Sequence, residues 1–157
     1  MPKNNVTRLL DSRDIAYQAF ELPPEKRSAE ETARLLGVDP ALIYKTIVVE
    51  RRGRGKPILA VVPGSREVDL KALARVVGEK KVTTATQARA EKLTGLRAGG
   101  ISPLALINRG FDMVIDRDAL AERAVYLSGG DRSISLRLSG QDLVELTGAD
   151  TGPISSS

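Results

Sequence analysis

Residues 43–63 read IYKTIVVERRGRGKPILAVVP, and this stretch decides the fold. Residues 43–52 form the strongest strand pattern of the chain, and the apolar run 57–63 follows after a turn that contains glycine. Two such runs joined by a short glycine-containing turn predict a β-hairpin. Side chains alternate between the faces of a strand, and both faces of 43–52 are largely apolar. We therefore expect a hairpin whose first strand is covered on both sides.

Short helices and strands are predicted on either side of this hairpin. Ser28 and Glu31 form a capping-box pattern at the start of one helix, and Asp69 is placed to cap another. The predicted helices span residues 6–13, 29–36, 70–77, 87–93 and 140–147, with a helical turn at 39–40. The predicted strands span residues 15–22, 43–52, 57–63, 80–84, 111–116, 124–128 and 133–139.

The order of these elements indicates the fold class. Several connections are too short for β–α–β crossovers, which predicts a mixed sheet rather than a doubly wound one. At 157 residues, with neither an internal repeat nor a linker, the chain fits one domain. We expect an α/β (α+β) domain, a mixed β-sheet surrounded by short helices, over residues 1–148. The segment 149–157, which contains TGPISSS, is predicted to be a flexible tail.

The composition narrows the possible chemistry. The chain contains no cysteine and no histidine. Thiol nucleophiles, thiolate or imidazole metal sites and the Ser-His-Asp triad are therefore excluded. We expect neither a bound metal nor a cofactor. No stretch approaches the roughly 20 apolar residues that a membrane helix needs, so a cytoplasmic protein without membrane contact is expected.

Positive charge is concentrated in the middle of the chain. Residues 45–109 contain 14 Lys and Arg against 5 Asp and Glu, whereas the whole chain has a net charge of +4. This segregation is typical either of a solvated positive surface or of a face that binds a phosphate polymer. Aromatic residues make up only 3% of the chain, so a nucleic acid would be bound through its backbone or its end rather than by base stacking.

Lys45 is the first candidate functional residue. It shares one face of its strand with Ile43 and Ile47. A lysine in such a strand either lies in a cleft or carries a desolvation cost of several kcal/mol. The structural alternative is that Lys45 lies near the start of the strand and extends its ammonium outward to water.

Two glycine-containing segments are the other candidates. The run Gly99-Gly100-Ile101-Ser102-Pro103 has a flexible backbone whose N–H groups could hold a carbonyl oxygen or a phosphate. The run Ser128-Gly129-Gly130 ends a predicted strand, where a serine is a plausible ligand contact. Each of these glycine pairs is also compatible with an ordinary turn. The GRGK motif at residues 53–56 lacks the spacing and the following helix of a phosphate-binding loop, so that interpretation is rejected.

Together these segments resemble the YbaK/prolyl-tRNA synthetase editing-domain family. The resemblance rests on the run from Val38 to Thr46, the Gly99–Pro103 loop and the run from Tyr126 to Gly130, and it extends over residues 5–148. It implies a trans-editing deacylase that removes a wrong amino acid, most often Cys, from mischarged tRNA(Pro). The implied partners are the CCA end of the tRNA and prolyl-tRNA synthetase. The oligomeric state stays open.

The resemblance also implies roles for particular residues. Lys45, Gly99 and Gly100 correspond to the catalytic positions. The implied substrate-binding residues are Thr46, Ile101, Ser102, Pro103, Ser128, Gly129 and Gly130. The reaction it implies is substrate-assisted: the Cys thiol attacks its own ester carbonyl, or the ribose 2′-hydroxyl assists. Such a reaction suits a chain without His or Cys, because orientation alone can contribute roughly 7–11 kcal/mol.

Some questions stay open at the level of the sequence. The segment ELPPEKR after Phe20, and Ser135, depart from the pattern of the Cys-selective members, so editing of Ala or Ser is an alternative. A non-catalytic tRNA-binding or regulatory module is a second alternative. The cluster Arg51, Arg52, Arg54 and Lys56 near the hairpin tip is predicted to contact the tRNA backbone.

Overall fold

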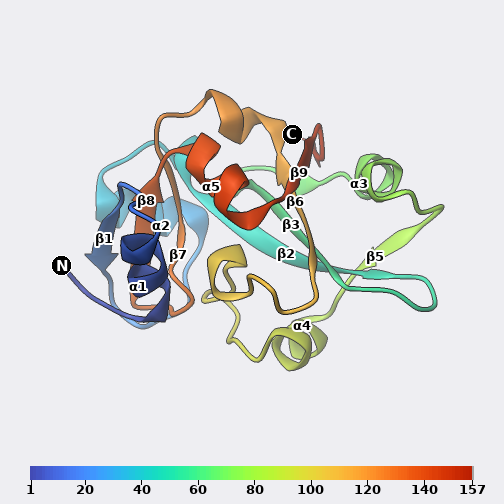
Figure 1. Cartoon of the computed structure of the whole chain (residues 1–157), viewed down its shortest axis with the longest axis horizontal. Coiled ribbons are helices and arrows are strands. Elements are labelled where there is room, and N and C mark those ends of the chain that lie inside the picture. Colours follow the sequence, from blue (N-terminus) through green and yellow to red (C-terminus); the bar gives the residue numbers. More distant parts are fainter. Residues whose placement is uncertain (157) are drawn as a thin grey trace.

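The computed structural model describes residues 1–156 (Figure 1). The helices are α1 (Asn5–Ser12), α2 (Ala29–Leu36), α3 (Leu70–Val77), α4 (Gln87–Thr94) and α5 (Gly140–Thr147), with 3-10 turns η1 (Pro40–Leu42), η2 (Pro103–Ala105) and η3 (Arg117–Ala121). The strands are β1 (Gln18–Glu21), β2 (Tyr44–Arg51), β3 (Ile58–Pro63), β4 (Glu67–Val68), β5 (Val82–Thr84), β6 (Asp112–Asp116), β7 (Val125–Ser128), β8 (Ile134–Leu138), β9 (Asp150–Gly152) and β10 (Ser155–Ser156).

The main sheet is mixed, as predicted. Its strand order is β5-β2-β3-β6-β9; β2 pairs antiparallel with β3 and β5, whereas β6 pairs parallel with β3 and β9. A smaller antiparallel sheet has the order β1-β8-β7. It lies with α1 and α2 at one end of the molecule, and the β2–β3 hairpin extends to the other end (Figure 1). The predicted α+β fold is confirmed.

The main sheet is covered on both faces, which explains the apolar pattern of β2 and β3. On one face, Val49 and Val62 pack in a core cluster with Leu73 of α3. On the other face, Val48 and Leu59 pack in a cluster with Leu106, which follows η2. Each buried Val or Leu side chain contributes about 1.5–3 kcal/mol to folding. Within residues 1–156, no helix is both long and apolar enough to cross a membrane.

The helix boundaries follow from capping chemistry. The Ser28 hydroxyl accepts a hydrogen bond from the Glu31 N–H, and the Glu31 carboxylate accepts one from the Ser28 N–H, which is the predicted capping box. The Asp69 side chain accepts from the Ala72 N–H at the start of α3. The helices α2 and α3 end at Gly37 and Gly78, both in the left-handed conformation.

The predicted flexible tail at 149–157 is wrong for the residues that the structure describes. Strand β9 pairs in register with β6, and β10 pairs with β4. Ile154 between them is fully buried, and the Ser155 hydroxyl donates to Asp116 Oδ2 at 2.6 Å. The domain therefore continues past residue 148 to Ser156. The segment 149–156 contains one large apolar residue, Ile154. This pattern is too weak to predict two short strands whose partners lie far away in the sequence.

Candidate active site

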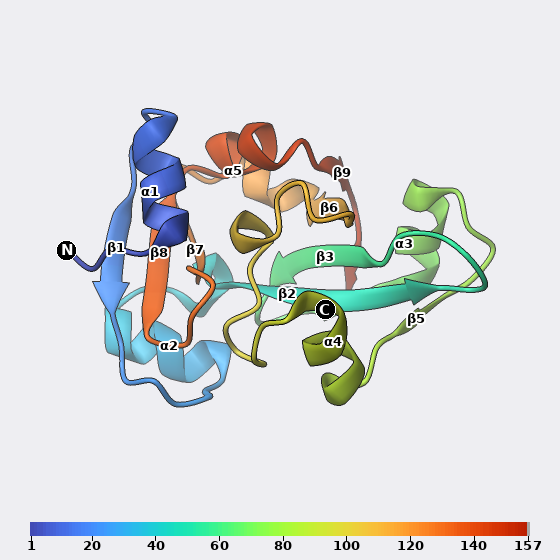
Figure 2. The same ribbon diagram turned by 60° about the horizontal axis from the view of Figure 1, so that its bottom comes forward.

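A cleft of about 560 Å³ opens beside the first half of β2. Its walls come from β2, the segment 26–32 that leads into α2, the segment 84–90 around the start of α4, the loop 98–101 and the facing ends of β7 and β8. Figure 2 shows α2 and α4 below β2 in that view. The volume lies in the range of small-molecule binding sites.

Lys45 projects into this cleft from β2. Its side chain is 30% exposed, and its ammonium lies 3.4 Å from the Gly64 carbonyl oxygen and 3.5 Å from Glu67 Oε1. Both contacts are long for hydrogen bonds to an ammonium. The sequence left open whether Lys45 lies in a cleft or extends outward to water, and the structure places it in the lining of a cleft. The loose coordination leaves the ammonium able to bind an anionic group of a ligand.

Thr46 and Tyr44 flank Lys45 in β2 and also line the cleft. Tyr44 is buried, and burial together with the nearby carboxylates of Asp116 and Asp118 raises the pKa of its hydroxyl. The phenol therefore stays protonated over the physiological pH range. Tyr44 can supply a neutral hydroxyl and apolar surface, but not a phenolate base.

The predicted glycine loop reaches the cleft only in part. Gly99 and Ile101 line it, whereas Gly100, Ser102 and Pro103 are not among the described lining residues. The Gly100 N–H donates to the Arg97 carbonyl oxygen at 2.8 Å, so it is already engaged. A Cβ atom on Gly100 would lie 3.3 Å from the backbone of Asp131 and Arg132. Gly100 thus allows two segments to pack closely, and its expected catalytic role stays a prediction.

Ser102 and Pro103 have structural roles in the same loop. Ser102 is fully buried, and its hydroxyl accepts from the Leu104 N–H at 3.2 Å, which caps η2. Pro103 is the first residue of that turn. Both residues anchor the loop, and their expected contact with the substrate stays a prediction.

The residues of the run 128–130 also differ in their positions, because one of them lines the cleft and the other two do not. Ser128 lines the cleft, and its hydroxyl accepts from the Gly130 N–H at 3.2 Å. A Cβ atom on Gly129 would lie 2.8 Å from the Ile134 side chain, so glycine is required there for packing between β7 and β8. Neither Gly129 nor Gly130 is a described lining residue. Ser135, opposite Ser128 in the β7–β8 register, lines the cleft as well.

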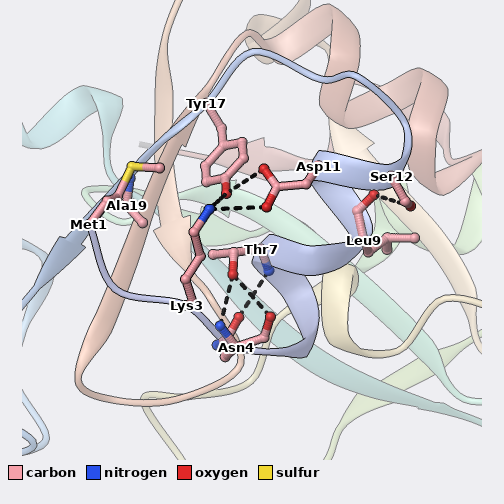
Figure 3. Close-up of polar contacts among 9 residues, drawn as sticks. All are labelled: Met1, Lys3, Asn4, Thr7, Leu9, Asp11, Ser12, Tyr17 and Ala19. Carbon is pink, nitrogen blue, oxygen red and sulfur yellow. Dashed lines mark hydrogen bonds and ion pairs between the residues drawn. The ribbon is translucent and has the colours of Figure 1, made fainter.

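The N-terminal segment holds the loop that follows Ser128 in the cleft wall. The Asn4 side chain accepts from the Thr7 N–H at 2.9 Å and so caps α1 (Figure 3). Its amide nitrogen donates to the Gly129 carbonyl oxygen at 3.0 Å. Lys3, Asp11 and Tyr17 form a separate exposed group of hydrogen bonds on the same segment (Figure 3). Asn4 therefore joins the start of α1 to the loop that follows Ser128.

Three further cations line the cleft and were not predicted: Lys26, Arg27 and Arg132. Arg132 Nε donates to the Ala98 carbonyl oxygen at 2.6 Å, and Lys26 Nζ donates to Gln87 Oε1 at 2.9 Å. The first contact joins the loop between β7 and β8 to the loop 98–101, and the second joins the segment before α2 to the start of α4. With Lys45 the described lining holds four cationic side chains, against one acidic residue, Glu30. The resulting potential favours an anionic ligand.

The predicted tRNA-contacting cluster lies at the other end of β2. Lys45 and Arg51 are six residues apart, which is about 20 Å in a strand. Arg52, Arg54 and Lys56 are exposed. The Arg51 side chain is only 11% exposed and pairs with Glu79 and Asp112. Arg51 is thus engaged within the protein and less accessible to a phosphate than the three exposed members of the cluster, for which tRNA contact stays a prediction.

The described residues offer no metal site. Among residues 1–156, no group of three or more His, Cys, Asp or Glu is arranged to hold a metal ion. The cleft is instead a cation-lined site with neutral small residues on its wall, including Ser128 and Ser135. Such a site can bind a phosphate-bearing ligand and orient a neutral group beside it.

Comparison with known proteins is consistent with this chemistry. The family model described as aminoacyl-tRNA editing domain matches residues 23–146. The chain belongs to the aminoacyl-tRNA editing domain family. The resemblance to the YbaK/prolyl-tRNA synthetase editing-domain group that the sequence indicated is confirmed. The matched residues include the whole described lining of the cleft except Leu22.

Three relatives illustrate the family. EbsC of Enterococcus faecalis, named as a candidate Cys-tRNA(Pro)/Cys-tRNA(Cys) deacylase, is 31% identical over 156 residues, which cover 98% of this chain and 94% of EbsC. The prolyl-tRNA editing protein ProX of Acetoanaerobium sticklandii is 26% identical over 152 residues, covering 94% and 92% of the two chains. A crystal structure of a candidate trans-editing enzyme for prolyl-tRNA synthetase superposes with a TM-score of 0.82 at 27% identity and covers 100% of both chains.

Proposed function

We propose that this editing-domain protein is a trans-acting deacylase that removes a wrongly attached amino acid, foremost Cys, from tRNA(Pro). The observation that carries the proposal is the cleft: four cations line it, in a chain without His or Cys. Such a site suits the anionic 3′ end of a tRNA, while a Cys nucleophile and a His general base are missing. The names of EbsC and ProX support the same substrate class.

Lys45 is the proposed contact to the CCA end. Its ammonium is held by two long interactions inside the cleft and can exchange them for a phosphate or for the ester oxygen. Lys26, Arg27 and Arg132 surround the cleft and add charge for the terminal nucleotides. Thr46, Gly99 and Ile101 are the proposed walls of the ester site, with Ser128 facing the amino-acid side chain.

The proposed reaction uses a nucleophile from the substrate. With Cys-tRNA, the thiol sulfur bonds to the ester carbonyl carbon and the bond from that carbon to the ribose oxygen breaks. The thiol proton passes to the released ribose oxygen, and the amino acid leaves as a cyclic thioester. With amino acids that lack a thiol, water attacks the ester with help from the ribose 2′-hydroxyl. In both routes the protein contributes binding and orientation, which can account for several kcal/mol of the barrier.

A deacylation panel tests the proposal. Transfer RNA(Pro) charged with Cys, Ala, Ser or Pro is incubated with the protein, and ester loss is followed over time. Attack by the thiol predicts that the Cys ester is cleaved far faster than the Ser ester. Comparable cleavage of Ala and Ser esters indicates the water route, and a terminal 2′-deoxyadenosine then tests the 2′-hydroxyl. Tight binding of all four without cleavage would contradict a deacylase and favour a tRNA-binding module.

Prolyl-tRNA synthetase is the proposed source of the substrate, and the cytoplasm, where tRNA is charged, the proposed location. The solved relative described as a trans-editing enzyme for prolyl-tRNA synthetase supports this partner.

A further inference from the structure

We infer that a basic edge of the main sheet, joined to the cleft by strand β5, binds the sugar-phosphate backbone of the tRNA acceptor end. The basic edge consists of Arg52, Arg54, Lys56, Lys80 and Lys81, all exposed. This inference rests on the proposed function and adds the path that the tRNA takes away from the cleft. The surface combines the hairpin tip with a second segment, the turn before β5.

The register of the sheet brings the two segments together. Arg51 pairs with Val82 in the antiparallel β2–β5 ladder. Arg52, which follows β2, and Lys81, which precedes β5, are therefore the next residues on these two neighbouring segments. Strand β5 is one of the two edge strands of the main sheet, and it leads from Lys81 back toward α4 (Figure 1). The cations of residues 52–56 and those of residues 80–81 are 24 to 29 positions apart in the sequence, and the register gathers them at one end of the molecule.

The edge strand connects this surface to the cleft. Thr84, at the end of β5, lines the cleft, and Lys81 precedes it by three residues, about 10 Å in a strand. Thr83 and Thr84 are exposed between these points. Threonine hydroxyls and lysine ammonium groups are common donors to phosphate and sugar oxygens. A nucleic-acid strand can therefore pass from the cleft along β5 to the basic edge.

The positive charge of this surface is not cancelled by neighbouring carboxylates. Glu79 and Asp112, which lie beside it, are both paired with Arg51. Glu50, opposite Thr83 in the register, is paired with Arg89 at 3.0 Å. None of the ion pairs described for residues 1–156 involves a member of the basic edge. Arg51 thus offsets one of the two local negative charges, and the five cations of the basic edge keep the surface positive overall.

An RNA backbone fits this surface better than a protein partner does. Protein interfaces depend on buried aromatic or aliphatic anchors at their centre. The exposed residues of the basic edge and of β5 are Lys, Arg, Thr and Gly, without an exposed apolar side chain among them. Contacts to phosphate need only charge and hydrogen-bond donors, and they are independent of the base sequence.

The test compares two double variants that remove the same charge. Lys80→Gln with Lys81→Gln changes the basic edge, and Arg8→Gln with Arg13→Gln changes the α1 end of the molecule, where both arginines are exposed. Binding of uncharged tRNA(Pro) is measured as a function of salt. The first variant should lower the magnitude of the log–log salt slope by about 1.4–1.8, since each phosphate contact accounts for about 0.7–0.9. The second should leave the slope unchanged.

A second substrate separates this surface from the cleft. Aminoacylated CCA trinucleotide reaches the cleft but not the basic edge, so the Lys80/Lys81 variant should cleave it like the unchanged protein while its KM for charged tRNA rises. Equal slopes for all three proteins, or equal losses on tRNA and trinucleotide, would overturn the inference. So would loss of binding to prolyl-tRNA synthetase with tRNA binding intact. Failure of the unchanged protein to cleave any ester would instead refute the proposed function, because the slope is measured on uncharged tRNA.

Discussion

Lys45 and Arg51 lie near opposite ends of β2, and the protein holds them in different ways. Arg51 is 11% exposed; it pairs with two carboxylates and donates through Nε to the Lys56 carbonyl oxygen at 2.9 Å. Lys45 is 30% exposed and has two contacts at 3.4 and 3.5 Å, one of them to Glu67, whose side chain is 84% exposed. The first cation is satisfied by contacts within the fold, whereas the second has only long contacts, which a ligand can replace in the proposed function.

The difference shows that charge in a strand does not by itself identify a functional residue. Burial opposes the charged form of Arg51, but the hydrogen bonds that its guanidinium donates to Asp112 and Glu79 outweigh this effect and raise the pKa of Arg51. The guanidinium therefore joins β2 to β6 and to the turn after α3. Lys45 has no comparable set of partners in the described structure. The number and quality of existing partners distinguish the two roles.

The largest expected effect concerns Lys45. Lys45→Ala should lower kcat/KM for charged tRNA by about 100-fold or more, the size seen when one preorganised donor is removed from a site. The free energy of unfolding should change by less than about 1 kcal/mol, because a long, solvent-exposed ion pair contributes little. Single-turnover deacylation and urea unfolding measure the two quantities.

Lys45→Met is the matched control, since it keeps most of the aliphatic side chain and removes the charge. Its activity should be as low as that of Lys45→Ala. A folded Lys45→Ala protein with full activity on every charged tRNA would refute the assignment of the site.

Arg51 should show the opposite pattern. Arg51→Met should lower the free energy of unfolding by about 2 kcal/mol, between the values for exposed and for buried ion pairs, because Glu79 and Asp112 lose their counter-ion. The kcat of the folded protein should stay unchanged, since the side chain lies about 20 Å from Lys45. Denaturant unfolding and saturating kinetics provide the measurement.

A triple variant tests the cause of that loss. Arg51→Met combined with Glu79→Gln and Asp112→Asn removes all three charges, so most of the lost stability should return. If the triple variant is no more stable than Arg51→Met alone, packing of the arginine stem rather than its charge stabilises the hairpin.

The same contrast explains what the sequence could predict. The hairpin and the capped ends of α2 and α3 were predicted because periodicity, caps and glycine stops are local signals. The partners of Arg51 lie 28 and 61 residues away, and the strands that pair with β9 and β10 are equally remote. No local pattern reports such pairings, and therefore the sequence alone predicts a free cation at Arg51 and a flexible tail in place of the C-terminal strands.

The candidate site was predicted in outline for a similar reason. Lys45 stood out because it interrupts an apolar strand, whereas Lys26, Arg27 and Arg132 belong to irregular segments without periodicity. The glycine pairs were recognised, but the sequence does not distinguish a glycine that faces a ligand from one that allows close packing. Gly99 lines the cleft, while its neighbour Gly100 packs on the backbone of residues 131–132.

Substitution of Glu67 should have a small effect, and it tests directly whether Lys45, unlike Arg51, acts without a partner inside the protein. Glu67 is the one carboxylate that the described structure places on Lys45, at 3.5 Å. Glu67→Gln keeps the β4–β10 backbone pairing and removes only the charge. Because the pair is exposed and long, the free energy of unfolding should change by less than about 0.5 kcal/mol. Activity should be retained, with KM for charged tRNA unchanged or lowered up to about twofold, because the ammonium loses a competitor for phosphate.

The opposite result would be equally informative. If Glu67→Gln reduced kcat as strongly as Lys45→Ala does, Glu67 would be orienting Lys45, and the lysine would be positioned by an internal partner just as Arg51 is. Glu67→Lys separates the two explanations further. A like charge beside Lys45 should displace its ammonium and raise KM, while a second cation at the rim should still attract tRNA at low salt. Kinetics at two salt concentrations distinguish a misplaced lysine, which impairs both conditions, from a lysine that remains free to bind the substrate.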